Sequence, residues 1–460
     1  MNMVLFLISM LLPTAAGYVL VIGEEAFSPV ERTIYSFTLG TGLLSFYLYG
    51  LLLLELLFSF WSLLPFFTLF LIIASFRWRA IIERRSCSAR ISFPDYSAAK
   101  KSIYYLLLIL IVWKVLFIVF IICSGPTMFS DSYTTWNYKA KIIYYMQSAN
   151  MSPGGGIFQG PFTHYPLHLP IMRAWIAFCI GQWDETFVNL HSVILFICLL
   201  GLVYEFLKRR AGAIRALIII WVLTGIPVLI NNVLSGYADF AVGYLFLASM
   251  VLLHYWHITG KKRFLVFTGM LVSVAMFTKL EGLAIVFPAL LITFFICLLS
   301  PRYSWKRILN SLGLFVISSS LIVFWLIKSQ ALNALMAISG INNSAVRFHP
   351  EGIRQLVEML FVYRSHNLFW FGISFIFVLK WRAALRPEVR FFLIPSVLSF
   401  CAVLFVFLFT QNIQWLMDGT SINRTMLVVI PLLTLAGGLL FVPERSSDAE
   451  DGLKLYSTSS

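Results

Sequence analysis

The sequence predicts an all-α protein, a polytopic bundle of transmembrane helices. The chain of 460 residues is 60% hydrophobic and only 12% charged, and its mean hydropathy is +0.87. Soluble domains are about 45–50% apolar and about 25% charged, so a water-soluble core cannot take up this many apolar side chains. Apolar runs of roughly 20 residues recur along the chain, and each is long enough to cross a hydrocarbon layer about 30 Å thick. The runs are apolar throughout rather than alternating, which excludes a membrane β-barrel.

The apolar runs predict about thirteen membrane spans. The first run lacks the basic residues that begin a signal peptide, so we interpret it as a span. Two pairs of spans, within 35–76 and 264–300, follow each other almost without a loop. The predicted spans are 2–22, 35–55, 58–76, 103–123, 184–207, 212–230, 236–256, 264–279, 281–300, 308–328, 364–380, 391–410 and 424–442.

Basic residues follow every second span and predict the orientation. They gather at 77–90, 208–210, 261–263, 302–307 and 380–390. Such loops lie in the cytoplasm by the positive-inside rule, which accounts for the net charge of +14 without a nucleic-acid partner. We therefore expect an integral multi-pass protein of a bacterial cytoplasmic (inner) membrane, with its N-terminus outside.

The spans form one predicted transmembrane domain, residues 1–442, followed by a disordered cytoplasmic tail at 443–460. Long loops at 124–183, 329–363 and 411–423 are expected on the outer face, where they are candidates for function. The apolar segment 165–182 contains two prolines, and counting it as a span would move the next basic cluster outside. We expect it to form an interfacial or re-entrant helix on the outer face, packed on protein.

Four ionisable residues fall at the outer membrane boundary by this count: Asp131, Asp239, Lys279 and Glu281. Ionisable residues at span ends are costly and mark sites or pathways by default. Each also has a structural interpretation. Asp131 and Asp239 suit helix N-termini, and Lys279 and Glu281 suit a structural ion pair.

Four motifs occur in a fixed order across residues 103–300. They are SDSYTTWNYKAK with Asp131, the Pro-rich HYPLHLPIMRAW, GYADFAVGYLF with Asp239, and TKLEGLA at 278–284. This order resembles the GT-C class of polytopic glycosyltransferases, which use polyprenyl-phosphate sugars. The likeness is greatest to the branch with the dolichyl-phosphate-mannose protein mannosyltransferases and the aminoarabinose transferase of lipid A.

The resemblance implies glycosyl transfer with inversion on the extracytoplasmic face. Asp131 would be the general base, and Asp239 and Glu281 the other catalytic acids. The leaving lipid phosphate is an anion, so it requires cations rather than a general acid. The expected substrate-binding residues are the cations Lys279, Arg347, Arg354 and Arg424, together with Trp136, His164, Tyr165 and His168. The two histidines also suit interfacial packing.

Many members of the class carry paired acids in the first outer loop, whereas Ser130 and Ser132 flank Asp131 here. The sequence establishes no cofactor, and a divalent metal (Mg²⁺ or Mn²⁺) stays open, with Asp131 and Asp239 as its ligands. The implied partners are a polyprenyl-phosphate-linked sugar donor, an acceptor glycan, lipid or protein, and membrane lipids. The main alternative is a transporter or flippase of lipid-linked sugars, which should contain internal repeats and broken helices with charge near the midplane. A structural or assembly membrane protein is the third interpretation.

Overall fold

The computed structural model describes residues 1–77, 96–127, 129–146, 165–299, 304–329, 346–419 and 421–442. Within these ranges the chain is helical and contains no strand, as predicted. The first half contains α1 (Asn2–Val21), α2 (Pro29–Leu53), α3 (Phe60–Phe76), α5 (Ala98–Cys123), η2 (Ser132–Trp136), α6 (Asn137–Met146), α7 (His168–Ile180), α8 (Glu185–Ala211), α9 (Ala213–Leu223) and α10 (Pro227–Ser235). The second half contains α11 (Ala238–Thr259), α12 (Lys262–Thr278), η4 (Gly282–Val286), α13 (Phe287–Leu298), α14 (Trp305–Ser319), η5 (Ser320–Ile322), α15 (Val323–Ser329), α17 (Glu351–Val357), η6 (Glu358–Val362), η7 (Arg364–His366), α18 (Phe369–Leu379), α19 (Trp381–Ala384), α20 (Pro387–Phe409), α21 (Ile413–Met417), α22 (Ile422–Thr425), η8 (Met426–Val428) and α23 (Ile430–Leu439).

Six of the described helices are long and apolar enough to cross a membrane, or up to eight if each bent pair is one span. The structure thus supports a membrane-embedded helical protein, but the prediction of thirteen spans is not confirmed. The predicted span 212–230 bends by 72° between α9 and α10, where Pro227 starts the second helix. Residues 231–235, which lie between this predicted span and the next, form the end of α10. The predicted span 424–442 bends by 51° before α23, and the span at 364–380 is reduced to the 11 residues of α18.

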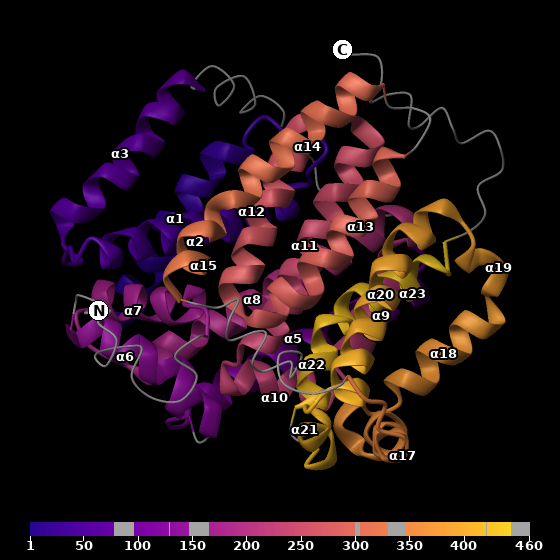
Figure 1. Cartoon of the computed structure of the whole chain (residues 1–460). Helices are drawn as coiled ribbons and strands as arrows, with labels where there is room; N and C mark the ends of the chain where they lie inside the picture. Colours follow the sequence, from indigo (N-terminus) through magenta and orange to yellow (C-terminus); the bar gives the residue numbers. More distant parts are fainter. Residues whose placement is uncertain are drawn as a thin grey trace.

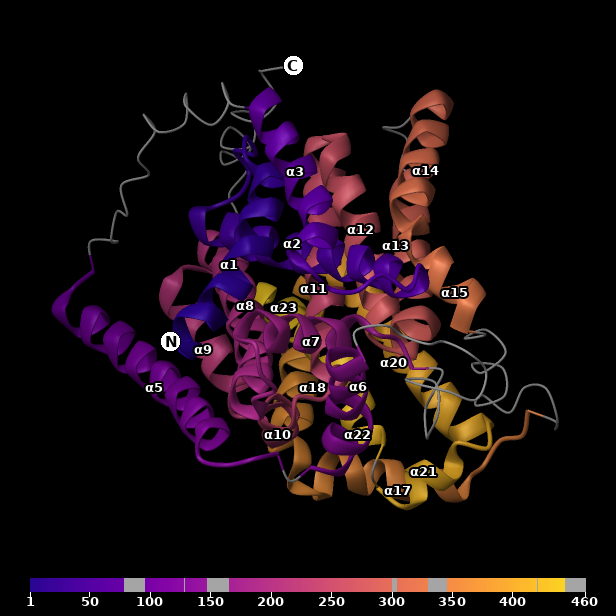
Figure 2. The ribbon, with the colours of Figure 1, turned by 90° about the vertical axis from the view of Figure 1, so that its left-hand side faces the viewer.

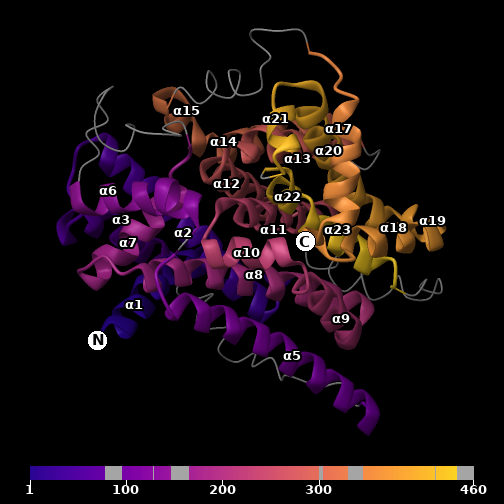
Figure 3. The ribbon, with the colours of Figure 1, turned by 90° about the horizontal axis from the view of Figure 1, so that it is seen from below.

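Helix α11 forms the centre of the bundle, and α5 lies at its edge. The most apolar 18-residue stretch of α11 is 100% buried, whereas the corresponding stretch of α5 is only 17% buried. Helix α11 packs against α8, α12 and α23, and α5 packs against α8, α9 and α10. Figures 2 and 3 show α5 slanting along this edge. The apolar surface that α5 exposes is what a lipid-facing helix requires.

Close contact between α1 and α2 depends on small residues. A Cβ atom on Gly40 would lie 1.8 Å from the carbonyl oxygen of Pro13. Small residues let helix backbones approach in this way within membranes. Helix α2 also begins with a capping box, in which the backbone N–H of Glu31 donates to Ser28 Oγ (3.0 Å) and Ser28 N–H donates to Glu31 Oε2 (2.8 Å). These two features fix where α2 starts and how it lies on α1.

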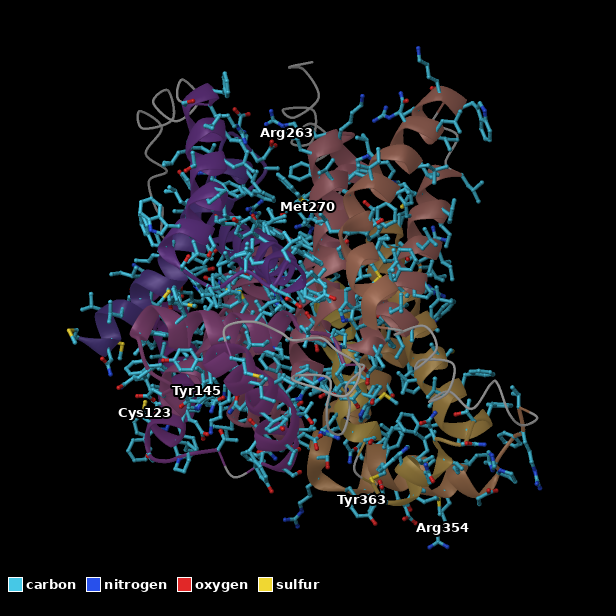
Figure 4. The ribbon with its side chains drawn as sticks, turned by 60° about the vertical axis from the view of Figure 1, so that its left-hand side comes forward. Cys123, Tyr145, Arg263, Met270, Arg354 and Tyr363 are labelled. Carbon is cyan, nitrogen blue, oxygen red and sulfur yellow. The ribbon has the colours of Figure 1, made fainter. Side chains whose placement is uncertain are left out.

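The described residues of the basic loops share one end of the bundle. Three ion pairs join them to acids of other segments there: Arg209–Glu31, Arg210–Glu388 and Arg263–Glu24. Figure 1 shows α3 and α14 reaching toward this end, with α10, α17 and α21 at the opposite end. Figure 4 labels Arg263 at the basic end and Arg354 and Tyr363 at the other. The predicted grouping of these loops on one face is therefore present in the described residues.

The helix predicted at 165–182, interfacial or re-entrant and packed on protein, forms as α7. It is largely buried and packs against α1, α2, α6 and α8. It ends at Gly181, whose φ of +82° lies in the left-handed region that favours glycine. Packing on protein, rather than contact with a membrane surface, therefore accounts for its apolar sequence. The predicted tail at 443–460 lies outside the described residues.

Candidate functional site

A buried lysine joins two of the predicted acids. Lys279 Nζ donates to Asp239 Oδ1 and to Glu281 Oε1, both at 2.7 Å. Asp239 lies in the first turn of α11, Lys279 ends α12, and Glu281 precedes η4. The Asp239 side chain is only 3% exposed, so Lys279 compensates a carboxylate that water does not reach.

The third predicted acid pairs with an arginine from the far end of the sequence. Arg424 of α22 donates from Nη1 to Asp131 Oδ2, across 293 residues of chain. The Arg424 guanidinium also lies over the ring of Tyr237, 5.0 Å from its centroid, and Tyr237 immediately precedes α11. The side chains of Asp131 and Arg424 are 35% and 25% exposed, so this pair forms the accessible part of the cluster.

Tyr165 connects the two ion-paired groups. Burial is the main reason that its pKa is raised to about 12, and it lies within electrostatic range of Lys279, Glu281, Asp239 and Asp131. The ring of Tyr165 stacks on Trp136, with ring centroids 5.6 Å apart. Segments containing residues 131, 165, 239, 279 and 424 therefore meet in one place, which we call the acid–base cluster: Asp131, Tyr165, Asp239, Lys279, Glu281 and Arg424.

Lys139 contacts Tyr165 through its side-chain amine. Its Nζ donates to the carbonyl oxygen of Tyr165 (3.3 Å) and lies 5.8 Å from the centroid of the same ring. Burial lowers the pKa of Lys139 to about 7. Trp136 is also buried, so it holds Tyr165 in place instead of offering an open face to a sugar.

The turn that carries Asp239 is held by an arginine that the sequence analysis did not place in the site. Arg173 of α7 is fully buried and donates to Asn137 Oδ1 (2.8 Å) and to the carbonyl oxygen of Gly236. Gly236 has φ +65° and ends α10, and a Cβ atom there would meet Arg173 at 2.4 Å. Arg173 therefore links α7, α6 and the start of α11. A lone cation inside an apolar helix was the signal for it in the sequence.

Lys139 and Tyr237 were also missed as site residues. Both lie within motifs that were singled out for their acids, YTTWNYKAK and GYADF. The sequence singled out these segments because of the acids in them. The contacts of Lys139 with Tyr165 and of Tyr237 with Arg424 exist only in the folded chain.

Several predicted substrate-binding residues do not join the cluster. His168 is buried, and its Nδ1 pairs with Ser45 Oγ of α2 at 2.8 Å, which is a packing role. Arg354 is 88% exposed and pairs with Glu358 on its own helical segment. Arg347 is exposed, and its backbone N–H donates to the carbonyl oxygen of Phe409. The structure gives neither arginine a contact with the cluster, and His164 lies outside the described residues.

The donor set does not fit the divalent metal that the resemblance left open. Among the described residues, no three acidic, His or Cys side chains converge as metal ligands. The carboxylates of Asp131 and Asp239 are each occupied by a cationic side chain. A divalent ion would have to displace Arg424 or Lys279, so we derive no step through a metal.

The arrangement combines three carboxylates with two cations, beside a buried tyrosine. The exposed Asp131 is able to accept a proton, and Arg424 is able to bind a phosphate through two parallel hydrogen bonds. No protein-family model matches the sequence, and no curated protein matches it significantly.

Proposed function

We propose that the chain is a membrane glycosyltransferase, which moves a sugar from a polyprenyl-phosphate donor to an acceptor hydroxyl with inversion. The observation that carries the proposal is the direct pairing of Asp131 with Arg424 beside the Lys279 group. A carboxylate suited to take a proton and a cation suited to bind a phosphate are thus neighbours. Our proposal puts the cluster at the outer face of a bacterial cytoplasmic membrane, because the basic loops gather at the other end.

In the proposed reaction the acceptor oxygen attacks the anomeric carbon while the bond from that carbon to the phosphate oxygen breaks. The lipid phosphate leaves with the bonding electron pair, and the proton of the acceptor moves to Asp131. The leaving phosphate needs positive charge, which Arg424 supplies. When the donor phosphate binds Arg424 it replaces the Asp131 carboxylate there, so donor binding itself frees the base.

The other members of the cluster have supporting roles in this proposal. Asp239 and Glu281 already neutralise Lys279, so Lys279 contributes less charge to the phosphate than Arg424 does. Asp239 is too buried to reach an acceptor and fixes Lys279 instead. Asp131 is the most exposed of the three carboxylates and is the only one assigned to proton transfer.

The proposal is tested with the purified chain in proteoliposomes and a panel of polyprenyl-phosphate monosaccharides. A membrane extract supplies the acceptors, and mass spectrometry follows the lipids. We expect one donor to be converted to polyprenyl phosphate and an acceptor to gain an equal amount of sugar, with the configuration at the anomeric carbon of the transferred sugar inverted. Complete recovery of every donor in the panel would contradict the proposal.

Transport of a lipid-linked sugar is the second candidate, and the two bent helix pairs favour it. Helices α9 and α10 meet at 72°, and the α22–η8 segment meets α23 at 51°. Discontinuous helices of this kind line the substrate sites of many transporters. The same proteoliposomes separate the two functions, because a transporter would move the intact donor between leaflets and release no polyprenyl phosphate.

A further inference from the structure

A second polar site lies at the opposite end of the bundle from the acid–base cluster. Its cavity has a volume of about 730 Å³ and lies between α9, the α18–α19–α20 turns and the end of α23. Helix α23 begins next to η8, close to Arg424, and the three residues that follow its last residue line this cavity: Leu440, Phe441 and Val442. The two sites are therefore separated by the length of α23.

The charged side chains that line this cavity are all cationic. Its lining contains four cationic side chains and no carboxylate: Arg215, Lys380, Arg382 and Arg386. Among the described residues, none of the four forms an ion pair, whereas Arg209, Arg210 and Arg263 at the same end are all paired. Within the part of the chain that the structure describes, four cations without an ion-pair partner thus surround one cavity, and they provide a site for an anion.

One of the four cations is fixed by the fold and shapes the cavity. Arg386 donates from Nη1 to the carbonyl oxygen of Val442 (2.8 Å) and from Nη2 to that of Leu439 (2.7 Å). It thereby covers the carbonyl end of α23, which would otherwise repel an anion. Arg215, Lys380 and Arg382 are exposed and remain available to a ligand.

The surroundings of the cavity are apolar. Leu379 and Trp381 are 62% and 58% exposed, and Leu379 is the last residue of the apolar helix α18. Phe441, which follows α23 and also lines the cavity, is 40% exposed. The guanidinium of Arg382 lies 5.4 Å from the centroid of the Trp381 ring, an arrangement that suits the boundary between headgroups and acyl chains. A ligand that fills this site would have an anionic head and an apolar body.

We propose that this cavity binds the phosphate headgroup of an anionic glycerophospholipid, with its acyl chains along α18. Basic pockets between transmembrane helices recognise such headgroups at the cytoplasmic surface, which is where the basic loops are predicted. The proposal does not depend on the enzymatic function, because no residue of the cavity belongs to the acid–base cluster. A lipid headgroup and free phosphate present the same phosphate group to these cations. The test must therefore distinguish a lipid from soluble phosphate.

The test uses the full chain in neutral nanodiscs, titrated with phosphatidylglycerol and followed by native mass spectrometry. The variant Arg215→Gln/Lys380→Gln/Arg382→Gln removes the three available cations. The control Lys261→Gln/Lys262→Gln/Lys306→Gln removes the same charge from exposed positions at the same end. Each cation removed is expected to weaken binding about fivefold, so the first variant should bind roughly 100-fold more weakly and the control should bind like the wild type.

Equal binding by the wild type and the first variant would overturn the proposal, and so would an equal loss in the control. A second arm replaces the lipid with inorganic phosphate, and saturation at the same concentration would overturn the lipid assignment in favour of soluble phosphate. If the triple variant does not fold, the single charge reversal Lys380→Glu, at an exposed position, tests the same proposal. Its affinity for phosphatidylglycerol should fall by at least fivefold, and an unchanged affinity would overturn the proposal.

Discussion

Replacing Lys279 with methionine tests the electrostatic core of the acid–base cluster. The substitution removes the cation that contacts Asp239 and Glu281 at 2.7 Å each and leaves a similar apolar stem. Breaking a buried pair by removing one partner costs about 3–5 kcal/mol. Alternatively, the Asp239 or Glu281 carboxyl takes up a proton. The ordinary pKa of a carboxyl lies about three units below neutral pH, so this protonation costs about 4 kcal/mol. Both routes therefore predict a loss of about 4 kcal/mol.

This loss is measurable as a shift in the melting temperature. The unfolding entropy of about 2.1 cal/mol/K per residue gives roughly 1 kcal/mol/K for a chain of this length, so Tm should fall by about 4 °C. The assay is thermal unfolding in detergent, monitored by tryptophan fluorescence. The triple variant Lys279→Met/Asp239→Asn/Glu281→Gln carries no charge at these three positions, so it should recover most of the lost stability. A single Lys279→Met variant as stable as the wild type would refute the reasoning.

Three further perturbations have definite expected results. Gly40→Ala should lower the free energy of unfolding by about 1–3 kcal/mol, because its Cβ would meet the Pro13 carbonyl oxygen at 1.8 Å. Gly50→Ala, in the same helix with open space around it, is the control and should not destabilise the protein. The pKa of Lys139 is about 7, below that of an unfolded lysine, so the unfolded state binds more protons between about pH 7 and 10. Stability should therefore rise with pH across this window, and Lys139→Met should remove that rise in Tm. Parallel curves of Tm against pH for the wild type and the variant would contradict the lowered pKa of Lys139. Arg354→Ala should change neither Tm nor sugar transfer, since its ion pair is exposed; a loss of transfer would return Arg354 to the substrate site.

Charge counting along the sequence predicted which acids share one end of the molecule. Asp131, Asp239 and Glu281 follow from the alternation of basic loops, because each sits one boundary away from a cluster of Lys and Arg. The structure brings the three together, even though the total number of spans differs from the prediction. The predicted membrane face of each acid survives an error in the span count, because adding or removing a pair of crossings leaves that face unchanged. The chemical roles of these acids remain predictions.

The pairings inside the site were beyond the reach of the sequence. Arg424 and Asp131 are 293 residues apart, and no periodicity relates them. Arg347 and Arg354 have the same residue type and lie in another of the predicted outer loops, 329–363, yet they stay at the surface. Charge and position alone do not separate these arginines, because the choice depends on how α22 packs against α10 and α11.

The bent helices were missed for a different reason. Hydropathy averaged over a window does not register one proline, so 212–230 and 424–442 each resemble a single span. Pro227 and Pro431 both lie in the first turn after a break, where the missing N–H of proline costs nothing. A prediction that gave these prolines more weight would have found the two helix breaks and lowered the predicted number of straight spans.

The most direct test of the proposed mechanism is the turnover of polyprenyl-phosphate sugar by Asp131→Asn. The control is Asp418→Asn, the same substitution at an exposed acid that follows α21. Loss of a general base predicts a fall in turnover of about 10²–10⁴-fold for Asp131→Asn, with unchanged size-exclusion behaviour and donor binding still present. Asp418→Asn should transfer sugar at the wild-type rate. Wild-type turnover by Asp131→Asn would contradict the account, because no other carboxylate of the cluster is exposed enough to replace it.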